Sequence, residues 1–392
     1  MATGLNTSQT PTSRSRSMAA PDADPLLWLR LIRSRRVGAV TFHRLVADHG
    51  GIEAALAELP GIARAAGVQD YSLCPIEVVK AEAAQARLAS ARLLLWGRKG
   101  YPQALMDLPD APPVLWAQGD IDLLARPMVA LVGARNASSL GLRMTRRLVE
   151  GLALAGQVVV SGLARGIDAE AHQAALDSGT VAVQAGGVDV IYPIENKELA
   201  MAIAARGCRV SEQPMGLVPQ ARHFPQRNRI VSGLSRAVVV VEAAARSGSL
   251  ITAKNALDQG REVLAVPGHP FDARAAGCNI LLRDGAVLVR SAQDILEAIG
   301  VHGHFAVQEQ LPIEPVAVPD PLPGPVPQRR PLSESAALHS QILARLGPSP
   351  LAEDQLIRDL ALPPGTLSPA LISLELEGRI LRQSGGLLSR VD

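Results

Sequence analysis

A regular alternation of short apolar runs with helical segments between residues 128 and 290 constrains the fold more than any other feature of the sequence. The runs are nearly continuous in Val, Ala and Leu, which is typical of strands buried on both faces of a parallel sheet. They lie at 128–133, 157–162, 180–187, 237–243, 262–268 and 286–290, with helices expected near 139–155, 168–178, 195–206 and 249–259. The pattern predicts an α/β fold in which a mostly parallel sheet carries helices on both faces.

The composition limits the classes of protein to which the chain can belong. A net charge of +2 supplies no global field for nucleic acid, so a DNA site would have to be a local basic patch. The three cysteines, Cys74, Cys208 and Cys278, are far apart in the sequence, which argues against a zinc site or a disulfide framework and fits a reducing cytoplasm. No apolar run approaches the roughly 20 residues that span a bilayer. We therefore expect a cytoplasmic protein with no signal peptide and no membrane contact.

Changes in composition along the chain predict its domain boundaries. The expected order is a disordered tail, a helical domain, a sheet domain, a Pro-rich linker and a C-terminal domain, at residues 1–24, 25–105, 106–305, 306–334 and 335–392. A Pro-rich stretch at 102–127 is expected to be a mostly irregular connector. Short helices joined by Gly turns indicate a helix-hairpin-helix-like bundle in the helical domain. Its role is either contact with a DNA backbone or packing against a partner.

The pattern of the C-terminal domain indicates three helices followed by a short hairpin, which is typical of a winged helix. The helix that would read a DNA major groove contains residues 370–377, which are apolar and acidic. Base readout in that groove normally uses Arg, Lys, Asn or Gln. We therefore expect this domain to contact protein or to serve packing, in preference to binding a DNA sequence.

The segment from Arg222 to Ala253 indicates a site for phosphate. It begins with a basic, amide-rich stretch, continues into an apolar run, and ends in the turn Ser247-Gly248-Ser249, which opens a helix. The N-terminus of a helix offers unpaired N–H groups and a positive dipole end, and both favour anions. Arginines beside such a turn make phosphate the natural ligand.

Several basic residues follow the ends of other strands in the predicted sheet. Because parallel strands end at one edge, where ligands bind in such folds, we expect these side chains to converge on one groove. A groove of cations and N–H donors follows the backbone of a single strand, and the rings of His223 and Phe224 would stack on bases. The predicted DNA-binding residues are Arg135, Asn136, Arg165, Lys197, Arg222, His223, Phe224, Arg227, Asn228, Arg229, Ser247, Gly248 and Ser249.

Catalytic and cofactor motifs are not visible in the sequence. The first strand turn, VALVGARNASSLG, differs from the G-x-G-x-x-G fingerprint, so no cofactor and no metal are expected. We interpret Asp168 as the N-cap of its helix and His172 as a surface residue one turn later. Glu242 is interpreted as a residue that orients the arginines or caps the helix that begins at Ser249. The enzymatic alternative is a nucleotide hydrolase or phosphoribohydrolase in which Glu242 is the base. A further alternative is a scaffold that acts through its terminal domains.

The chain resembles the DNA processing protein A (DprA/Smf) family. The matching segments cover nearly all of residues 128–290 and include VALVGARNASSLG, SGLARGIDAEAHQAAL, VQAGGVDVIYPIEN, SEQPMG, HFPQRNRIVSGLS, VVEAAARSGSLITAKNAL, VPGH and GCNILLRDGA. LLLWGRKGYPQAL and PPVLWAQGD upstream also fit. The first turn reads Gly-Ala-Arg where the family also uses Gly-Ser-Arg or Gly-Thr-Arg, which removes a hydroxyl donor and keeps the arginine.

The resemblance implies a Rossmann-like domain that binds single-stranded DNA and forms a homodimer. It also implies a role in natural transformation, in which the family protects incoming single strands and loads the recombinase RecA on them. By position, Arg135, Lys197 and the HFPQRNR segment match the family's DNA-binding pocket. We therefore expect a recombination mediator that binds single-stranded DNA without sequence preference and catalyses no reaction.

Overall fold

The computed structural model describes residues 23–301, 332–346, 351–360, 362–383 and 387–391. The chain divides into two units, residues 1–309 and 310–392. The expected tail at 1–24 and the expected linker at 306–334 lie largely outside the described residues.

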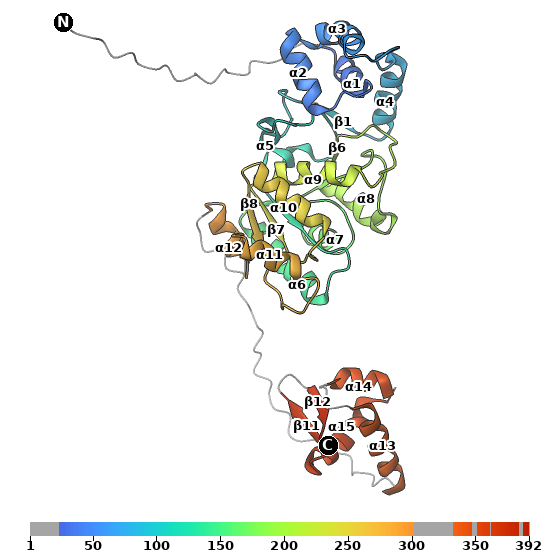
Figure 1. Ribbon diagram of the computed structural model, residues 1–392, viewed down its shortest axis with the longest axis vertical. Helices are drawn as coiled ribbons and strands as arrows, with labels where there is room; N and C mark the ends of the chain where they lie inside the picture. Colours follow the sequence, from blue (N-terminus) through green and yellow to red (C-terminus); the bar gives the residue numbers. More distant parts are fainter. Residues whose placement is uncertain (1–22, 302–331, 347–350, 361, 384–386, 392) are drawn as a thin grey trace, which may run out of the picture. The chain divides into compact units, whose positions relative to one another are not determined.

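The first unit is built on a sheet of nine strands among the described residues, in the order β1-β2-β6-β5-β4-β3-β7-β8-β9 (Figure 1). The seven strands from β6 to β9 run parallel, and β1 and β2 extend the sheet antiparallel beyond β6. The strands are β1 Arg92–Leu95, β2 Val114–Gly119, β3 Met128–Val132, β4 Val158–Ser161, β5 Thr180–Val183, β6 Cys208–Ser211, β7 Ala237–Val240, β8 Glu262–Ala265 and β9 Val287–Leu288. The prediction of a mostly parallel sheet is confirmed.

The prediction of an irregular connector at 102–127 is wrong. This stretch contains the short helix α5 (Gln103–Met106), strand β2 and a 3-10 turn at Ile121–Ala125. Strand β2 begins directly after Pro112 and Pro113, so the prolines precede the strand and remove no donor from its ladder. Strand β1 also joins the sheet, although its residues fall within the range 25–105 that was predicted to be helical.

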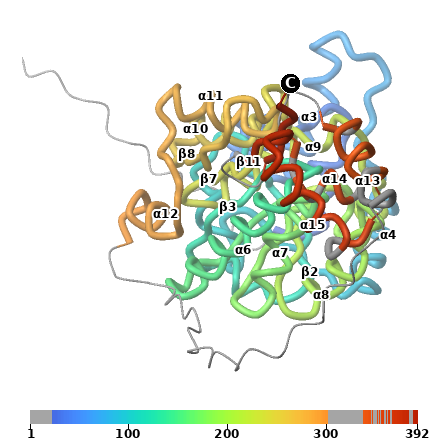
Figure 2. The backbone as a smooth tube through the Cα atoms, turned by 90° about the horizontal axis from the view of Figure 1, so that it is seen from below, coloured from blue at the N-terminus to red at the C-terminus, as the bar shows by residue number. Residues whose placement is uncertain are grey.

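Helices cover both faces of the sheet because alternate residues of each strand point to opposite faces. In β3, Val129 and Leu131 belong to a core cluster with α6 (Ser139–Leu154), α7 (Ile167–Ala174) and α12 (Ala292–Ala298). Met128, Ala130 and Val132 belong to the opposite cluster, with α9 (His223–Leu234), α10 (Gly248–Asp258) and α11 (Ala276–Arg283). Figure 2 shows β8, β7 and β3 between α10 and α11 on one side and α6 and α7 on the other.

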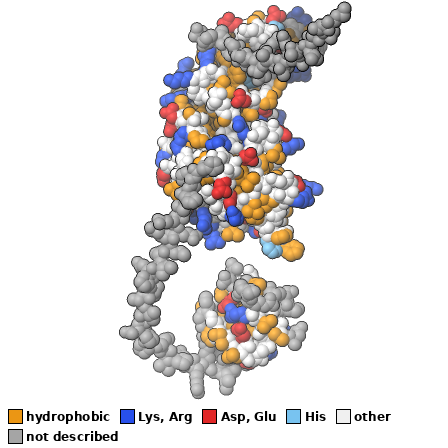
Figure 3. All heavy atoms as spheres, turned by 90° about the vertical axis from the view of Figure 1, so that its left-hand side faces the viewer, with side chains coloured by type: hydrophobic (Ala, Val, Ile, Leu, Met, Phe, Trp, Pro, Cys, Tyr) orange, Lys and Arg blue, Asp and Glu red, His pale blue; other side chains and the backbone are white. Residues whose placement is uncertain are grey.

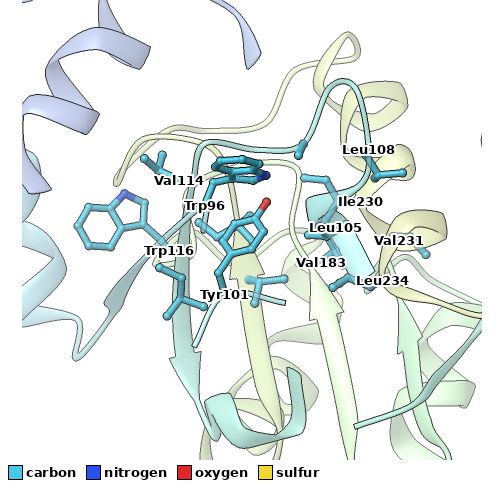
Figure 4. Close-up of a cluster of buried hydrophobic side chains, with 14 of the residues drawn as sticks. Trp96, Tyr101, Leu105, Leu108, Val114, Trp116, Val183, Ile230, Val231 and Leu234 are labelled. Carbon is cyan, nitrogen blue, oxygen red and sulfur yellow. The ribbon is translucent and has the colours of Figure 1, made fainter. Parts of the chain in front are cut away.

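The N-terminal helices share a core with the sheet. They are α1 Pro25–Arg33, α2 Ala39–His49, α3 Ile52–Ala65 and α4 Ile76–Leu88, which confirms the predicted helical bundle. Buried Glu82 of α4 accepts a hydrogen bond from Trp116 Nε1 of β2 (2.7 Å) and pairs with Arg33 of α1 (2.9 Å). Figure 4 shows how Trp96, Tyr101, Trp116 and the aliphatic side chains around them fill the adjoining part of this core.

The second unit contains the expected winged helix. Its elements are α13 Leu332–Arg345, β10 Leu351–Ala352, α14 Glu353–Leu360, α15 Pro364–Leu376, β11 Ile380–Gln383 and β12 Leu387–Arg390. In α15, Leu367, Leu371 and Leu374 are fully buried in the unit's core, while Ile372 and Leu376 are exposed. Among the described residues of the whole chain, no helix has the length and apolarity that crossing a membrane requires.

Candidate nucleic-acid interface

One cavity lies at the carboxyl ends of the parallel strands, between β3 and β7. The helix that follows β3 packs on one face of the sheet and the helix that follows β7 packs on the other, so the two connections diverge here. Such a switch point is where open α/β sheets bind their ligands. The cavity measures about 210 Å³. It is lined by Val132, Gly133, Arg135, Gly162, Ala164, Asp168, Phe224, Pro225, Arg227, Asn228, Val231, Ser247, Gly248, Ser249, Ile251 and Thr252.

A second cavity of about 300 Å³ adjoins the first and extends over the ends of β4 and β5. Both cavities are lined by Arg135, Gly162, Ala164, Phe224 and Arg227, so they form one continuous groove, which we call the strand-end groove. The second cavity adds Arg165, Ile191, Tyr192, Pro193, Ile194 and Glu195. A groove of this kind suits an extended polymer better than one compact ligand.

The basic segment after β6, for which the sequence predicted no secondary structure, is a helix. Helix α9 begins at His223 and presents Phe224, Arg227, Asn228 and Val231 to the cavity. These positions are three or four residues apart and therefore share one helical face. The spacing was visible in the sequence and separates the residues that line the groove from Arg222, His223 and Arg229, which line neither cavity.

Arg135, Phe224 and Tyr192 form a platform at the centre of the groove. The guanidinium carbon of Arg135 lies 5.5 Å from the centre of the Phe224 ring, and the Tyr192 ring lies 5.6 Å from Phe224. Arg135 is exposed and Tyr192 keeps 47% of its surface accessible. A cation held over an aromatic ring presents both a charge for phosphate and a flat surface for a base. Tyr192 was absent from the predicted set because its ring is brought to Phe224 only by the fold.

Arg227 lines the groove but is buried and bonded to the protein. Its guanidinium donates to the carbonyl oxygens of Gly162 and Val183, at the ends of β4 and β5, the second at 2.6 Å. Burial lowers the pKa of Arg227 to about 10, while Asp168 acts to raise it. Arg227 therefore links α9 to the ends of β4 and β5 by hydrogen bonds. Its buried positive charge also lies at the wall of the groove.

The interpretation of Asp168 and His172 as a cap and a surface residue is wrong, because both are buried. The N-cap of α7 is Gly166, and Asp168 accepts hydrogen bonds from the amides of Gly162 (3.1 Å) and Ala164 (3.4 Å). Burial raises the pKa of Asp168, and the Arg227 charge opposes that effect. Asp168 and Arg227 thus together fix the turn after β4.

The buried side chain of His172 on α7 is held in place by hydrogen bonds at both ring nitrogens. Its Nε2 accepts from the Leu163 amide (3.3 Å), which leaves Nδ1–H to donate to Thr180 Oγ1 (2.7 Å). Burial lowers the pKa of His172 to about 3, and the Arg227 charge acts in the same direction. The imidazole is therefore neutral and fully engaged, which suits a structural role better than proton transfer to a substrate.

Glu242, two residues after β7, caps the helix that follows β3, and not the helix at Ser249 that was predicted. Its carboxylate accepts hydrogen bonds from the Ser138 amide (2.9 Å) and the Ser138 hydroxyl (2.5 Å) at the N-terminus of α6. Ser138 in turn accepts from the Gly141 amide (2.9 Å). A carboxylate in this position compensates the positive helix end, so the α6 terminus is not open to phosphate. The contacts favour the cap over the general base of a nucleotide hydrolase.

The N-terminus of α10 faces the cavity, as the sequence predicts. Ser247 is its N-cap and accepts from the Ser249 amide (3.3 Å), and the two hydroxyl oxygens are 2.6 Å apart. The side-chain amide of Asn228 donates to the Gly248 carbonyl (3.3 Å), which links α9 to this turn. Ser247, Gly248 and Ser249 all line the groove.

The remaining predicted residues lie beside the groove or away from it. Arg229 is bound by protein, because its guanidinium pairs with Glu212 and with Asp110 (3.4 Å). Contrary to the prediction, the charge of Arg229 therefore faces these two carboxylates and does not line the groove. Exposed Arg165 lies 3.9 Å from Glu195 at the groove's edge.

Four further residues of the predicted set line neither cavity. Lys197, exposed, begins α8 (Lys197–Arg206), and Asn136 is exposed beside Arg135. Buried His223 has Arg222 Nε at 3.3 Å from its Nε2 and the Gln220 amide at 3.1 Å from its Nδ1, and the neutral ring accepts a hydrogen bond at one of these two nitrogens. Its ring is therefore not free for stacking on a base. Within the described ranges, no cluster of His, Cys, Asp and Glu is arranged to hold a metal ion.

Comparison with known proteins gives consistent matches over most of the chain. Residues 92–300 match the family model of DNA recombination-mediator protein A, residues 22–85 a DprA-like N-terminal HHH domain, and residues 326–386 a DprA winged helix domain. Protein Smf of Synechocystis sp. is 37% identical over 304 residues, which are 73% of this chain and 76% of that protein.

Two solved structures are also similar. DNA processing protein A of Streptococcus pneumoniae is 43% identical with a TM-score of 0.51, over 54% of this chain and 77% of that one. The structure of the same protein from Helicobacter pylori, described as showing a unique single-stranded DNA binding mode, is 31% identical with a TM-score of 0.50, over 53% of this chain and 95% of that one.

Proposed function

The chain belongs to the DNA processing protein A (DprA/Smf) family, and from this membership and the strand-end groove we propose that it binds single-stranded DNA without sequence preference and mediates recombination. The proposal includes protection of incoming single strands in natural transformation, transfer of the coated strand to a RecA-type recombinase, and action as a homodimer without catalysis. The single-stranded DNA binding mode described for the Helicobacter pylori protein supports the first part.

The observation that carries the proposal is the platform of Arg135, Phe224 and Tyr192 inside a continuous groove. A base stacked on an aromatic ring contributes about 1–3 kcal/mol and depends little on which base it is. Because every base has a stacking face, this arrangement favours binding without sequence preference.

In the proposed mode, phosphates lie along the strand ends. Arg135 pairs with one phosphate, the open N-terminus of α10 receives another, and the buried charge of Arg227 raises the potential beneath them. The net charge of +2 supplies little long-range attraction, and on the face drawn in Figure 3 the Lys and Arg side chains are interspersed with Asp and Glu. Affinity is therefore expected to come from the groove itself.

A salt titration with an oligo-dT tests the proposal. Binding of single-stranded DNA weakens by about 0.7 in log K per log salt for each phosphate contacted, so Arg135→Ala should lower both the affinity and this slope, the slope by about 0.7. Arg206→Ala is the matched control, because Arg206 pairs with Asp177 on the surface (2.8 Å) outside the groove. Equal binding by the Arg135 variant and the parent protein at every salt concentration would refute the proposed site.

A further inference from the structure

The loop between β8 and α11, residues 266–275, lies at the same sheet edge as the strand-end groove. Strand β8 pairs parallel with β7, so their carboxyl ends are adjacent. The loop is also bound to the turn after β7, because the Ala243 amide donates to the Arg274 carbonyl (2.6 Å) and the Gly277 amide donates to the Ala243 carbonyl (2.7 Å). A Cβ on Gly277 would lie 2.8 Å from the carbonyl oxygens of Ala243 and Ala244. This close packing holds the loop against the turn that leads to Ser247.

Phe271 in this loop is the most exposed large apolar side chain in the described part of the protein, with 94% of its surface accessible. Its ring centre lies 5.6 Å from that of His269, and its amide donates to His269 Nδ1 (3.3 Å). Asp272 and Arg274 on the following residues pair with each other (3.1 Å), which shapes the loop. The fold thus presents a planar aromatic side chain to solvent on a loop that is itself ordered by hydrogen bonds.

We propose that Phe271 is a second base-stacking site, which takes a base of the same single strand after that strand leaves the strand-end groove. The inference rests on the proposed function of the groove. Exposed Arg246 lies on the turn between the loop and Ser247, where its charge would meet the phosphates that connect the two sites.

The reach of the chain sets the length of DNA needed. From Ser247 to Ala243 and from Arg274 to Phe271 there are seven residue steps, which together with one hydrogen-bonded crossing span at most about 30 Å. At about 3.4 Å per nucleotide of a stacked strand, this distance corresponds to about nine nucleotides or fewer. Oligonucleotides that fill only the groove should therefore be insensitive to Phe271, and longer ones should depend on it.

A tryptophan at this position makes the contact visible. The chain has three tryptophans, Trp28, Trp96 and Trp116, and each is at most 8% exposed. In the full-length Phe271→Trp protein, oligo-dT of 15–20 nucleotides should quench the new fluorescence, and an oligo-dT of about four nucleotides should bind without quenching. Phe271→Ala should weaken binding of the long oligonucleotide about 5- to 150-fold and leave the short one unchanged.

Leu88→Ala serves as the matched control, because Leu88 is a similarly exposed apolar residue on α4, far from the groove in sequence, with 89% of its surface accessible. Unchanged affinity of Phe271→Ala for long oligonucleotides, together with absence of quenching, would overturn the stacking site while leaving the groove intact. If Phe271→Ala binds DNA normally but changes the sedimentation of the free protein, the side chain contacts a second protein copy, and the inference is also wrong. A parent protein that binds no oligonucleotide would overturn the proposed function itself.

Discussion

Replacing Gly141 with alanine should change the stability of the protein in opposite directions, depending on residue 242. A Cβ on Gly141 would lie 2.5 Å from the carboxyl carbon of Glu242 and 2.6 and 2.8 Å from its oxygens. The carboxylate would have to leave Ser138, and its two hydrogen bonds would be lost. In a protein with Glu242→Ala the obstruction is absent, and alanine should then stabilise the helix, as it does in most helical positions.

The size of the effect follows from these contacts. Hydrogen bonds to a charged group contribute about 1.5–3 kcal/mol each, and partial exposure of Glu242 reduces the pair to roughly 2–4 kcal/mol in total. Replacing glycine with alanine within a helix stabilises the folded protein by about 0.5–1 kcal/mol. Gly141→Ala should therefore destabilise the parent by about 1–3 kcal/mol and stabilise the Glu242→Ala protein by about 0.5–1 kcal/mol, a coupling of about 2–4 kcal/mol.

Urea unfolding of the four proteins, followed by the buried tryptophans of the first unit, measures this coupling. Gly61→Ala is the control, because Gly61 lies in α3 with open space around its Cα, so it should be neutral or stabilising in both backgrounds. A Gly141→Ala change that destabilises both backgrounds equally would refute the cap. Because Arg135 precedes Ser138 by three residues, both single variants should also bind oligo-dT more weakly than the parent.

Three further predictions concern buried charged or titratable groups. The pKa of His172 is about 3 in the folded protein and about 6.5 when exposed, so the unfolded chain binds a proton first as pH falls. Stability should decline below about pH 6.5 by up to about 1.4 kcal/mol per pH unit, and His172→Gln should flatten that decline in urea unfolding from pH 7 to pH 4. Arg227→Met removes the donor to the carbonyl oxygens of Gly162 and Val183 and the cation that acts on the buried carboxyl of Asp168, and should cost about 3–5 kcal/mol in the same assay at pH 7. Arg33→Met leaves Glu82 buried without its ion-pair partner and should cost a similar amount. An unchanged midpoint for either variant would contradict the contacts assigned to that arginine.

The sheet and its ligand edge were predictable from the sequence because buried parallel strands are nearly continuous apolar runs. The turns after those runs mark one edge of the sheet, which is why Arg135 and the Ser247–Ser249 turn were correctly placed at the carboxyl ends. Strand β2 was missed because its flanking prolines resemble a connector. Only its antiparallel pairing with β6, which begins more than ninety residues later, shows that it is a strand of the same sheet.

The sequence shows how many basic residues the segment before β7 contains, but their number does not predict which of them face the groove. Arg227 and Arg229 differ by two positions on α9 and therefore point in different directions. The partners of Arg229, Glu212 and Asp110, lie before the helix and on a distant loop, and those of Arg227 are backbone carbonyls on two strands. No local sequence signal contains such partners. Helical spacing from Phe224 would still have separated the two arginines, had the segment been recognised as a helix.

The N-termini of α6 and α10 both lie at the switch point, but they differ in what caps them. This difference explains how the side chains of the groove are held in position by the protein alone. Both termini carry a positive dipole end at the same sheet edge, and two open termini would each attract phosphate. Glu242 closes the one at α6 from within the protein, which fixes the turn that carries Arg135. The terminus at α10 has only the short Ser247 cap and stays open to the cavity. In the proposed binding mode, one terminus therefore positions a cation and the other receives a phosphate, and the carboxylate that holds the cation's turn lies 104 residues away from that turn in the sequence.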